Sequence, residues 1–266
     1  MTERANPILS VLEKLLSPTG CPWDREQTPR SLCDYLVEET FELVDAIRAD
    51  NLPEVREELG DVFFLLYFVV TLLERQGLLT LEEVLSSNAA KMIRRHPHVF
   101  GETEVSGRDE LLQNWERIKA GEKTGGEEDA PGGLFDSLPP SLPPMLKAYR
   151  INSKAARVGF TWETDQSQEE HLAGEWQEWL EARASEDAAR QEEEFGDYLF
   201  ALVEHGRRNS LKANAALDTA NQKFLRRFAA MERLAREQGT TLEELDLAAM
   251  NVLWETVKSR ESNPGE

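Results

Sequence analysis

One arrangement of acidic residues occurs twice in this chain, with the same internal spacing. Each copy has two acids three positions apart, followed by a second such pair. The eight acids are Glu39, Glu42, Glu58 and Asp61 in the first half, and Glu175, Glu178, Glu194 and Asp197 in the second. Because residues three apart share one face of an α-helix, each pair is expected to point in one direction.

The spacing also predicts that the two pairs of each half face each other across a helical hairpin. Between the first-half pairs lies the segment 49–53, Ala-Asp-Asn-Leu-Pro, which is typical of a turn followed by a helix with proline in its first turn. The first-half acids are placed symmetrically about Asp50 and the second-half acids about Glu186. In an antiparallel hairpin, such symmetrical residues lie level with each other.

Four facing carboxylates predict a metal site. Packed helices have axes roughly 8–10 Å apart, which leaves room for cations between the two rows of acids. A set of ligands made only of oxygen atoms suits a hard cation such as Mg²⁺, with Mn²⁺ as a substitute, and argues against zinc or copper.

The alternative is that these acids are ordinary surface charge. The chain has 50 acidic residues in 266, so a single pair of this kind is expected on a solvated helix face. The repetition of both pairs favours a site, and so do their neighbours. The segments 62–68 and 198–203, which directly follow Asp61 and Asp197, are strongly apolar. An unpaired charge in such surroundings is costly.

Composition excludes several classes of protein. The net charge of −20 argues against binding to nucleic acid or to an anionic membrane surface. Two cysteines, Cys21 and Cys33, do not indicate a disulfide framework. The first residues lack the apolar segment of a signal peptide, and the apolar run 62–73 is too short to span a bilayer. We therefore expect a soluble, cytoplasmic protein.

Apolar residues recur at helical spacing along most of the chain, and strand patterns are almost absent. The helical segments are Ile8–Leu16, Leu32–Ile47, Val55–Leu73, Leu81–Ile93, Leu111–Ile118, Leu172–Leu180, Glu192–Val203 and Leu211–Leu234. This predicts an all-α protein. We expect an N-terminal domain at 1–120, a Gly/Pro-rich linker at 121–145, a C-terminal domain at 146–258 and a frayed tail at 259–266.

The internal repeat extends beyond the acids and supports two copies of one helical unit. The motif Gly-x-x-Trp ends at Trp23 in the first half and at Trp162 in the second, and both rings are expected in the core. The sequence Lys-x-x-Arg-Arg also occurs twice, as does Trp-Glu-x-x-Lys. The basic residues and tryptophans concerned are Lys91, Arg94, Arg95, Trp115 and Lys119, and Lys223, Arg226, Arg227, Trp254 and Lys258.

The lysine and the second arginine of each Lys-x-x-Arg-Arg motif lie four apart, on one helix face, and could bind phosphate. The alternative, a solvated or ion-paired face, is weakened by the repetition. Each tryptophan, followed four residues later by a lysine, could stack a base beside a phosphate contact; packing explains these tryptophans equally well.

Together these motifs resemble the MazG family, tandem-domain nucleoside triphosphate pyrophosphohydrolases of an all-α superfamily. The resemblance rests on the segments 20–24, 38–42, 58–61, 94–101, 114–116, 155–160 and 223–228. It implies two helical-bundle domains that each carry four metal-binding carboxylates, a homodimer, dependence on Mg²⁺, and hydrolysis of nucleoside or deoxynucleoside triphosphates, (d)NTPs, to the monophosphate and pyrophosphate. Family roles include the removal of abnormal nucleotides.

One position departs from the family pattern. The pattern Glu-Glu-x-x-Glu is complete in the first half, where Glu38 precedes Glu39. In the second half Gly174 takes the place of the leading glutamate. On the resemblance, Glu38 is the candidate to orient or deprotonate water, while Lys91, Arg95, Arg94 and Lys119 stabilise the leaving pyrophosphate. Gly174 therefore favours the first half as the active one.

Other classes of protein remain as alternatives. A ferritin-like di-iron protein needs Glu-x-x-His, which does not occur with any of the four histidines. A non-catalytic protein that senses nucleotides or binds a partner fits the second half, where Gly174 lies. Within the enzymes, a specialised dUTP or phosphoribosyl-ATP pyrophosphohydrolase is also compatible with these motifs.

Overall fold

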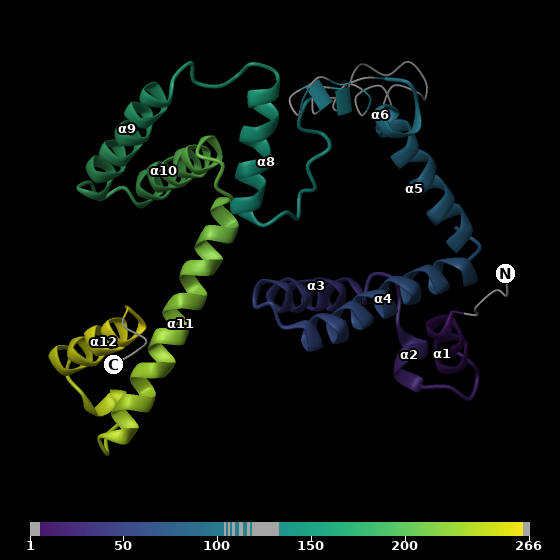
Figure 1. Cartoon of the computed structure of the whole chain (residues 1–266), viewed down its shortest axis with the longest axis horizontal. Helices are drawn as coiled ribbons and strands as arrows, with labels where there is room; N and C mark the ends of the chain where they lie inside the picture. Colours follow the sequence, from purple (N-terminus) through teal and green to yellow (C-terminus); the bar gives the residue numbers. More distant parts are fainter. Residues whose placement is uncertain are drawn as a thin grey trace. The chain divides into compact units, whose positions relative to one another are not determined.

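The computed structural model describes residues 6–103, 105, 107, 110–111, 114–115, 118 and 133–262. Within these residues the chain is helical and has no strand, which confirms the all-α prediction (Figure 1). The chain divides into two compact units, Met1–Gly125 and Gly126–Glu266. The finer limits predicted from the sequence, 1–120, 121–145, 146–258 and 259–266, remain predictions. Among the described helices, none has the length and apolar character that crossing a bilayer requires.

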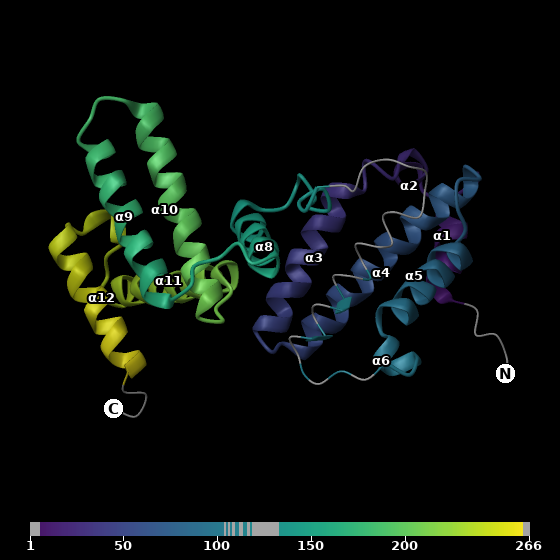
Figure 2. The ribbon, with the colours of Figure 1, turned by 90° about the horizontal axis from the view of Figure 1, so that it is seen from above.

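The first unit is built on the predicted helical hairpin. Its helices are α1 (Pro7–Leu15), α2 (Pro22–Glu26), α3 (Cys33–Arg48), α4 (Leu52–Arg75), α5 (Leu81–Arg95) and α6 (Pro97–Phe100). Helices α3 and α4 run antiparallel, and α1 packs against α4 (Figure 2). Buried side chains between them form an apolar core made of Leu12, Leu16, Leu32, Leu65, Phe68 and Leu72. Helix α5 continues from the end of α4 and carries the first basic motif.

The turn between α3 and α4 lies where the sequence predicts it. Asp50 adopts a left-handed backbone conformation with a φ of 52°. The Asn51 side-chain amide donates a hydrogen bond to the Glu54 carboxylate at 2.6 Å, which ties the turn to the start of α4. Proline at the first turn of α4 has no N–H group that would need an intrahelical partner.

The second unit repeats this hairpin and also contains a second pair of packed helices. Its elements are α8 (Pro144–Arg157), α9 (Asp165–Arg183), α10 (Ala188–Arg208), α11 (Ala213–Glu237), a 3₁₀ turn η1 (Leu242–Glu244) and α12 (Leu247–Ser262). Helices α9 and α10 form the hairpin that carries the second set of acids, and α8 packs against α10. Helices α11 and α12 pack together around an apolar core formed mainly by Met231, Leu234, Ala235, Leu242, Leu253 and Val257.

Two boundaries differ from the expectations. Helix α8 begins at Pro144, inside the segment expected to be linker, because a proline in the first helical turn costs no hydrogen bond. Helix α12 continues through Ser262, whereas fraying was expected from Ser259. The Glu261 carboxylate accepts hydrogen bonds from Arg226 and Arg227 of α11, and these contacts hold the last turn of α12 in place.

The repeated Gly-x-x-Trp motif needs its glycine for a different reason in each half. A side chain at Gly20 would place its Cβ 2.0 Å from the carbonyl oxygen of Leu15. Gly159 instead has a φ of +88°, which side chains disfavour. The prediction that both tryptophans lie in the core is wrong for Trp23, whose side chain is 50% exposed. Trp162 is half-buried.

Candidate metal centres

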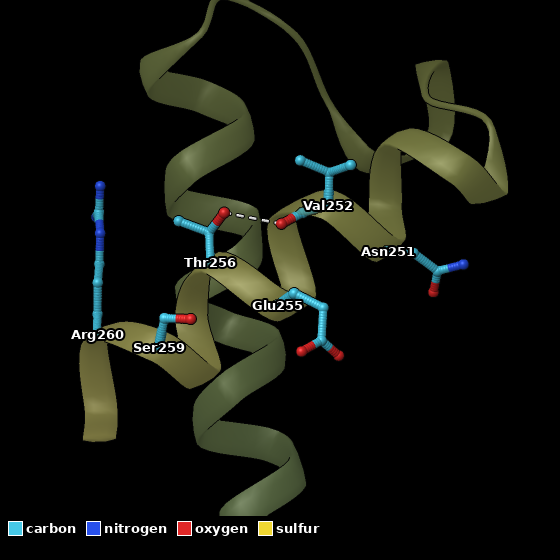
Figure 3. Close-up of a pocket in the computed structure, with 6 residues that line it drawn as sticks. All are labelled: Asn251, Val252, Glu255, Thr256, Ser259 and Arg260. Carbon is cyan, nitrogen blue, oxygen red and sulfur yellow. Dashed lines mark hydrogen bonds between the residues drawn. The ribbon is translucent and has the colours of Figure 1, made fainter. Parts of the chain in front are cut away.

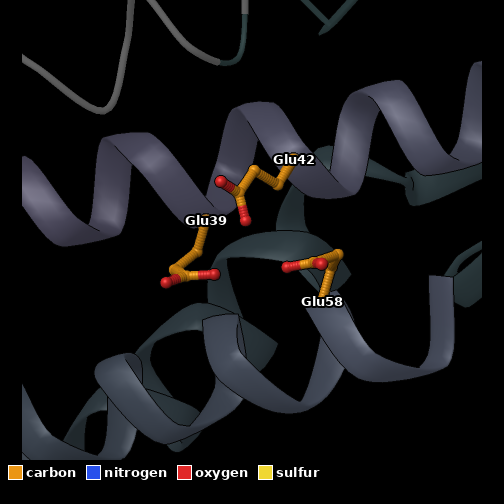
Figure 4. Close-up of side chains that lie close together, drawn as sticks. All are labelled: Glu39, Glu42 and Glu58. Carbon is orange, nitrogen blue, oxygen red and sulfur yellow. The ribbon is translucent and has the colours of Figure 1, made fainter. Parts of the chain in front are cut away.

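In the first unit, three of the four predicted ligands come together. Glu39 and Glu42 of α3 and Glu58 of α4 each offer a carboxylate oxygen, and these oxygens lie within 4.8 Å of one another (Figure 4). Asp61 is exposed and lies outside this group, one turn further along α4. It is still close enough for its charge to raise the pKa of Glu39. The hairpin therefore gathers three acids tightly and places the fourth beside them.

The electrostatics of this cluster favour an incoming cation. Partial burial raises the pKa of Glu39 above its ordinary value of 4.5, and the charges of Asp61 and Glu42 raise it further. The pKa of Glu58 is raised by desolvation first and by the Glu42 charge second. Both burial and the neighbouring carboxylate charges therefore disfavour the ionised forms. A bound cation would remove that penalty.

The second unit forms a similar cluster from Glu175 of α9 and from Glu194 and Asp197 of α10, again with oxygens within 4.8 Å. Glu178 is exposed and outside this tight group. Burial raises the pKa of Glu175; the nearby His171 lowers it in part, and the charges of Glu178, Asp197 and Glu194 raise it again.

Two partners of the second cluster could not be predicted from the spacing of the acids. The His171 Nε2 atom lies 3.4 Å from a Glu175 oxygen, and the Arg190 Nε atom lies 3.7 Å from a Glu194 oxygen. Both are four residues from the acid they contact, on the same helix. Helical spacing alone could have suggested them, but only the structure shows which of many such pairs point at the cluster.

The residues present fit a hard divalent cation. The donors in both clusters are carboxylate oxygens, and each cluster combines acids from two helices. Such a donor set suits Mg²⁺ or Mn²⁺ better than softer metals. Its acids would hold the cation between the two helices of the hairpin.

The residue that precedes the first acid of each cluster differs between the two units. Glu38 is exposed on α3, beside Glu39, and its charge contributes to the raised pKa of Glu39. Gly174 occupies the equivalent position of α9, and a Cβ added there would meet nothing within 4 Å. Glycine is therefore not required at this position for steric reasons.

The structure pairs each tryptophan of the Trp-Glu-x-x-Lys motif with an arginine of the basic motif. The Arg95 guanidinium lies over the Trp115 ring at 5.6 Å, and the Arg227 guanidinium lies over the Trp254 ring at 5.9 Å. The Phe224 ring contacts Trp254 as well, at 5.3 Å. The repetition of this cation–π contact supports the packing interpretation of the tryptophans.

The basic residues of α11 are grouped with α12. Arg226 and Arg227 both donate to Glu261, at 3.2 and 2.7 Å. The Lys258 amino group pairs with the neighbouring Glu255 at 2.8 Å. Lys223 of the second unit is exposed. In the first unit Arg94 is exposed, and Lys91 and Arg95 are half-buried. Lys119 lies outside the described residues. Sequence reasoning missed Glu261, because its partners lie 34 and 35 positions away in the chain.

A hollow of about 600 Å³ lies on one face of α12, between residues 251 and 260 (Figure 3). The Thr256 hydroxyl that faces it donates to the carbonyl of Val252 at 2.8 Å, within the helix. Neither carboxylate cluster contributes a residue to it, so it is not part of the candidate metal centres.

Comparison with known proteins agrees with this architecture. Residues 27–100 match the MazG nucleotide pyrophosphohydrolase domain. The chain is 37% identical to the nucleoside triphosphate pyrophosphohydrolase of Escherichia coli strain K12 over 257 residues. This alignment covers 96% of the present chain and 97% of the Escherichia coli protein. Over 251 residues the present chain is 39% identical to the nucleoside triphosphate pyrophosphohydrolase/pyrophosphatase MazG of Thermotoga maritima, with 94% of each chain covered.

A solved structure of a MazG-related protein from Thermotoga maritima is 25% identical and covers 43% of this chain and 98% of its own, with a TM-score of 0.38. That score is too low to bear on the fold. The two sequence relatives, by contrast, align along almost their whole length, through both carboxylate hairpins. The chain therefore belongs to the MazG family of nucleotide pyrophosphohydrolases.

Proposed function

We propose that this protein is a Mg²⁺-dependent nucleoside triphosphate pyrophosphohydrolase, which converts a (d)NTP and water to the (d)NMP and pyrophosphate. The observation that carries this proposal is the cluster of three carboxylates held by two helices, present in each unit. The names of the two long relatives give the same activity. Mn²⁺ would substitute for Mg²⁺, because the donor oxygens accept either ion.

In the first unit, Glu39, Glu42 and Glu58 would hold the cation, with Asp61 completing the set. When bound, the cation neutralises triphosphate charge and lowers the pKa of a coordinated water. In the second unit the cation would be held by Glu175, Glu194 and Asp197, with Glu178 as the fourth ligand.

Glu38 is the candidate general base of the first unit. It is exposed and adjacent to the cluster, so it can take the proton of a water that attacks the α-phosphorus. The bond from the α-phosphorus to the bridging oxygen then breaks, and pyrophosphate leaves with that oxygen. Lys91 and Arg95, with Arg94 and Lys119, would stabilise the charge on the leaving group. In the second unit, phosphate would be bound by Lys223, Arg227 and Lys258. Arg227 lies beside Trp254 there, as Arg95 lies beside Trp115 in the first unit.

A homodimer is part of the proposal. Both helices of the first hairpin expose large apolar side chains, which a single copy leaves in water: Val37, Phe41, Ile47, Leu59, Phe63 and Leu66. A second copy packed on these helices would bury them. The net charge of −20 argues against nucleic acid and anionic membranes as partners and is compatible with a cytoplasmic location.

The experiment that tests the proposal is product identification in ¹⁸O-labelled water, with Mg²⁺ and a panel of nucleotides. Attack at the α-phosphorus places the label in the monophosphate and releases unlabelled pyrophosphate. Release of orthophosphate would contradict the proposal. Preference for dUTP or phosphoribosyl-ATP alone would make the enzyme a specialised member of the same class.

A second candidate function follows from Gly174. Because the second unit lacks the leading glutamate, it could bind nucleotide and regulate the protein without catalysing hydrolysis. Nucleotide binding that persists when the first cluster is inactivated, with no remaining turnover, would support this alternative.

A further inference from the structure

The second unit contains a cavity beside its carboxylate cluster that the proposed reaction does not use. The cavity has a volume of about 590 Å³ and lies between α8, the segment 158–162, α10 and the segment 134–135. Its walls include four aromatic side chains, Phe135, Phe160, Trp162 and Phe200. Lys154, itself buried, donates to the carbonyl of Leu134 at 3.0 Å and so fixes the segment 134–135 against α8.

Two polar side chains in this cavity are almost fully buried. Asn152 of α8 is only 7% exposed, and its Nδ2 atom has no hydrogen-bond partner among the residues that the structure describes. Glu204 of α10 is 1% exposed, and Arg207 donates to both of its oxygens, at 2.6 and 2.7 Å. A buried amide without a partner is costly, and a ligand that supplies an acceptor at this point would remove the cost.

The cavity is connected to the second carboxylate cluster by direct contacts. The Trp162 ring, which lines the cavity, stacks on His171 at 5.1 Å. His171 in turn lies 3.4 Å from Glu175, a member of the cluster. Along α10, Asp197 of the cluster and Glu204 of the cavity are seven residues apart on one helix face, a distance of roughly 10 Å.

We propose that this cavity is the nucleobase subsite of a nucleotide whose phosphates lie at the second carboxylate cluster, with Asn152 donating a hydrogen bond to the base. Aromatic walls suit a flat heteroaromatic ring, and Phe160, which is 83% exposed at the cavity, is free to stack on it. The Asn152 amide supplies the donor that a base carbonyl or ring nitrogen requires. The inference rests on the proposed function, because it takes a nucleotide as the ligand.

The first unit differs at two positions of this lining. At the positions equivalent to Phe200 and Glu204 it has Phe64 and Phe68. Phe68 is completely buried in the core with Leu12 and Leu16. The subsite is therefore a property of the second unit, and it concerns binding, whichever unit turns the nucleotide over.

The test is calorimetric titration of the full-length protein with AMP, GMP, CMP and UMP, and with pyrophosphate, which carries no base. Asn152→Leu should weaken binding of the preferred monophosphate about five- to tenfold, the effect of one lost hydrogen bond, and leave pyrophosphate binding unchanged. Ser153→Ala, which changes the neighbouring residue outside the cavity, should match the wild type. Phe160→Ala, at an exposed position, should weaken monophosphate binding without affecting folding.

Wild-type affinity for the monophosphate in both Asn152→Leu and Phe160→Ala would overturn the inference; if the wild type hydrolyses triphosphates, the proposed function would still stand. Monophosphate binding that depends on Asn152 in a protein without hydrolysis would support the subsite and contradict the proposed function. A wild type that neither binds monophosphates nor hydrolyses triphosphates would contradict both. The melting temperature of ligand-free Asn152→Leu should not fall, because the substitution removes an unpartnered donor.

Discussion

Phe68 and Glu204 occupy equivalent positions, 136 residues apart, and both are fully buried. In the first unit Phe68 packs against Phe64, edge to face, at a centroid distance of 5.8 Å. In the second unit the Glu204 carboxylate is held by two hydrogen bonds from Arg207. The same hairpin is thus stabilised by apolar packing in one unit and by a buried ion pair in the other.

Removal of one partner of this ion pair should destabilise the second unit strongly. Arg207→Met leaves the Glu204 carboxylate buried without a counter-charge, and we expect a loss of about 3–5 kcal/mol in the free energy of unfolding. Hydrogen bonds to Glu204 also raise the pKa of Arg207, so the pair acts as a unit. Chemical denaturation followed by circular dichroism measures the loss.

The control is the double variant Glu204→Leu with Arg207→Met, in which both charges are replaced by apolar side chains of similar size. It should recover most of the lost stability, since no charge remains unpaired. A double variant as unstable as Arg207→Met alone would show that packing, and not the unpaired charge, causes the effect.

Replacing Gly174 by glutamate should stabilise α9 and complete the family pattern in the second unit. Glycine in the middle of a helix costs roughly 0.5–1 kcal/mol relative to good helix formers, and there is open space for the new side chain. If the leading glutamate activates water, Gly174→Glu should also raise turnover in a background where Glu39→Gln has silenced the first unit. Gly174→Ala is the control, because it restores the helix former without the carboxylate. Equal turnover in the two variants would remove that role from the leading glutamate.

The carboxylate clusters should make the metal-free protein less stable as the pH rises. The pKa values of Glu39, Glu58 and Glu175 are raised in the folded state above their ordinary value of 4.5. An acid with a raised pKa favours folding while it is protonated, so this contribution is present below pH 4.5 and is lost as the pH rises through the folded-state value. In the presence of a chelator, the melting temperature should therefore fall as the pH rises from below 4.5 through the folded-state pKa values of these acids.

Mg²⁺ should reverse that loss at neutral pH, because it binds the ionised carboxylates of the folded protein only. The variant Glu39→Gln distinguishes the contribution of the cluster to this pH dependence from the contribution of the overall net charge. In chelator, its melting temperature should change less with pH than that of the wild type. Identical pH dependence in the two proteins, together with no effect of millimolar Mg²⁺, would contradict the clusters as metal sites.

Glu261 should hold the end of α12 against α11 above pH 4.5 and release it on acidification. Hydrogen bonds from Arg227, and then from Arg226, lower the pKa of Glu261. An acid with a lowered pKa stabilises the fold above its unfolded value and loses this contribution as the pH falls through the folded value. Hydrogen exchange of the last turn of α12 at neutral pH should be faster in Glu261→Gln, and unchanged in Glu255→Gln. Equal protection in wild type and Glu261→Gln would show that the pair does not anchor the helix.

The hairpins were predictable because the information is local. Four acids symmetrical about Asp50 require two antiparallel helices and a turn, and the structure has α3, α4 and a left-handed Asp50 at that place. Helix α8 was missed: no helical segment was expected between residues 118 and 172, and the prolines that precede α8 indicate an extended segment. Trp23 was assigned to the core on its residue type, although half of its side chain meets water in the isolated chain.

The remaining features depend on contacts between segments distant in sequence. Glu261 and Arg227 are joined by the packing of α12 on α11, and the cavity beside Asn152 exists only when α8, α10 and the segment 158–162 meet. Periodicity places such residues on a helix face but does not say which other helix that face will contact. The three-acid clusters were predictable in part. The spacing of the acids predicted the members of each cluster, but only the structure shows that Asp61 and Glu178 lie outside the tight groups.

The most direct test of the account is the hydrolysis of a mixed (d)NTP panel with Mg²⁺ by the variants Glu39→Gln and Glu175→Gln and by the protein carrying both. Glu57→Gln and Glu193→Gln, which change exposed neighbours on the same hairpins, are the controls. We expect monophosphate and pyrophosphate from the wild type and both controls, loss of activity in the single variant of the active unit, and at least a hundredfold loss in the double variant. A double variant that retains wild-type turnover would contradict the carboxylate clusters as the centre of the reaction.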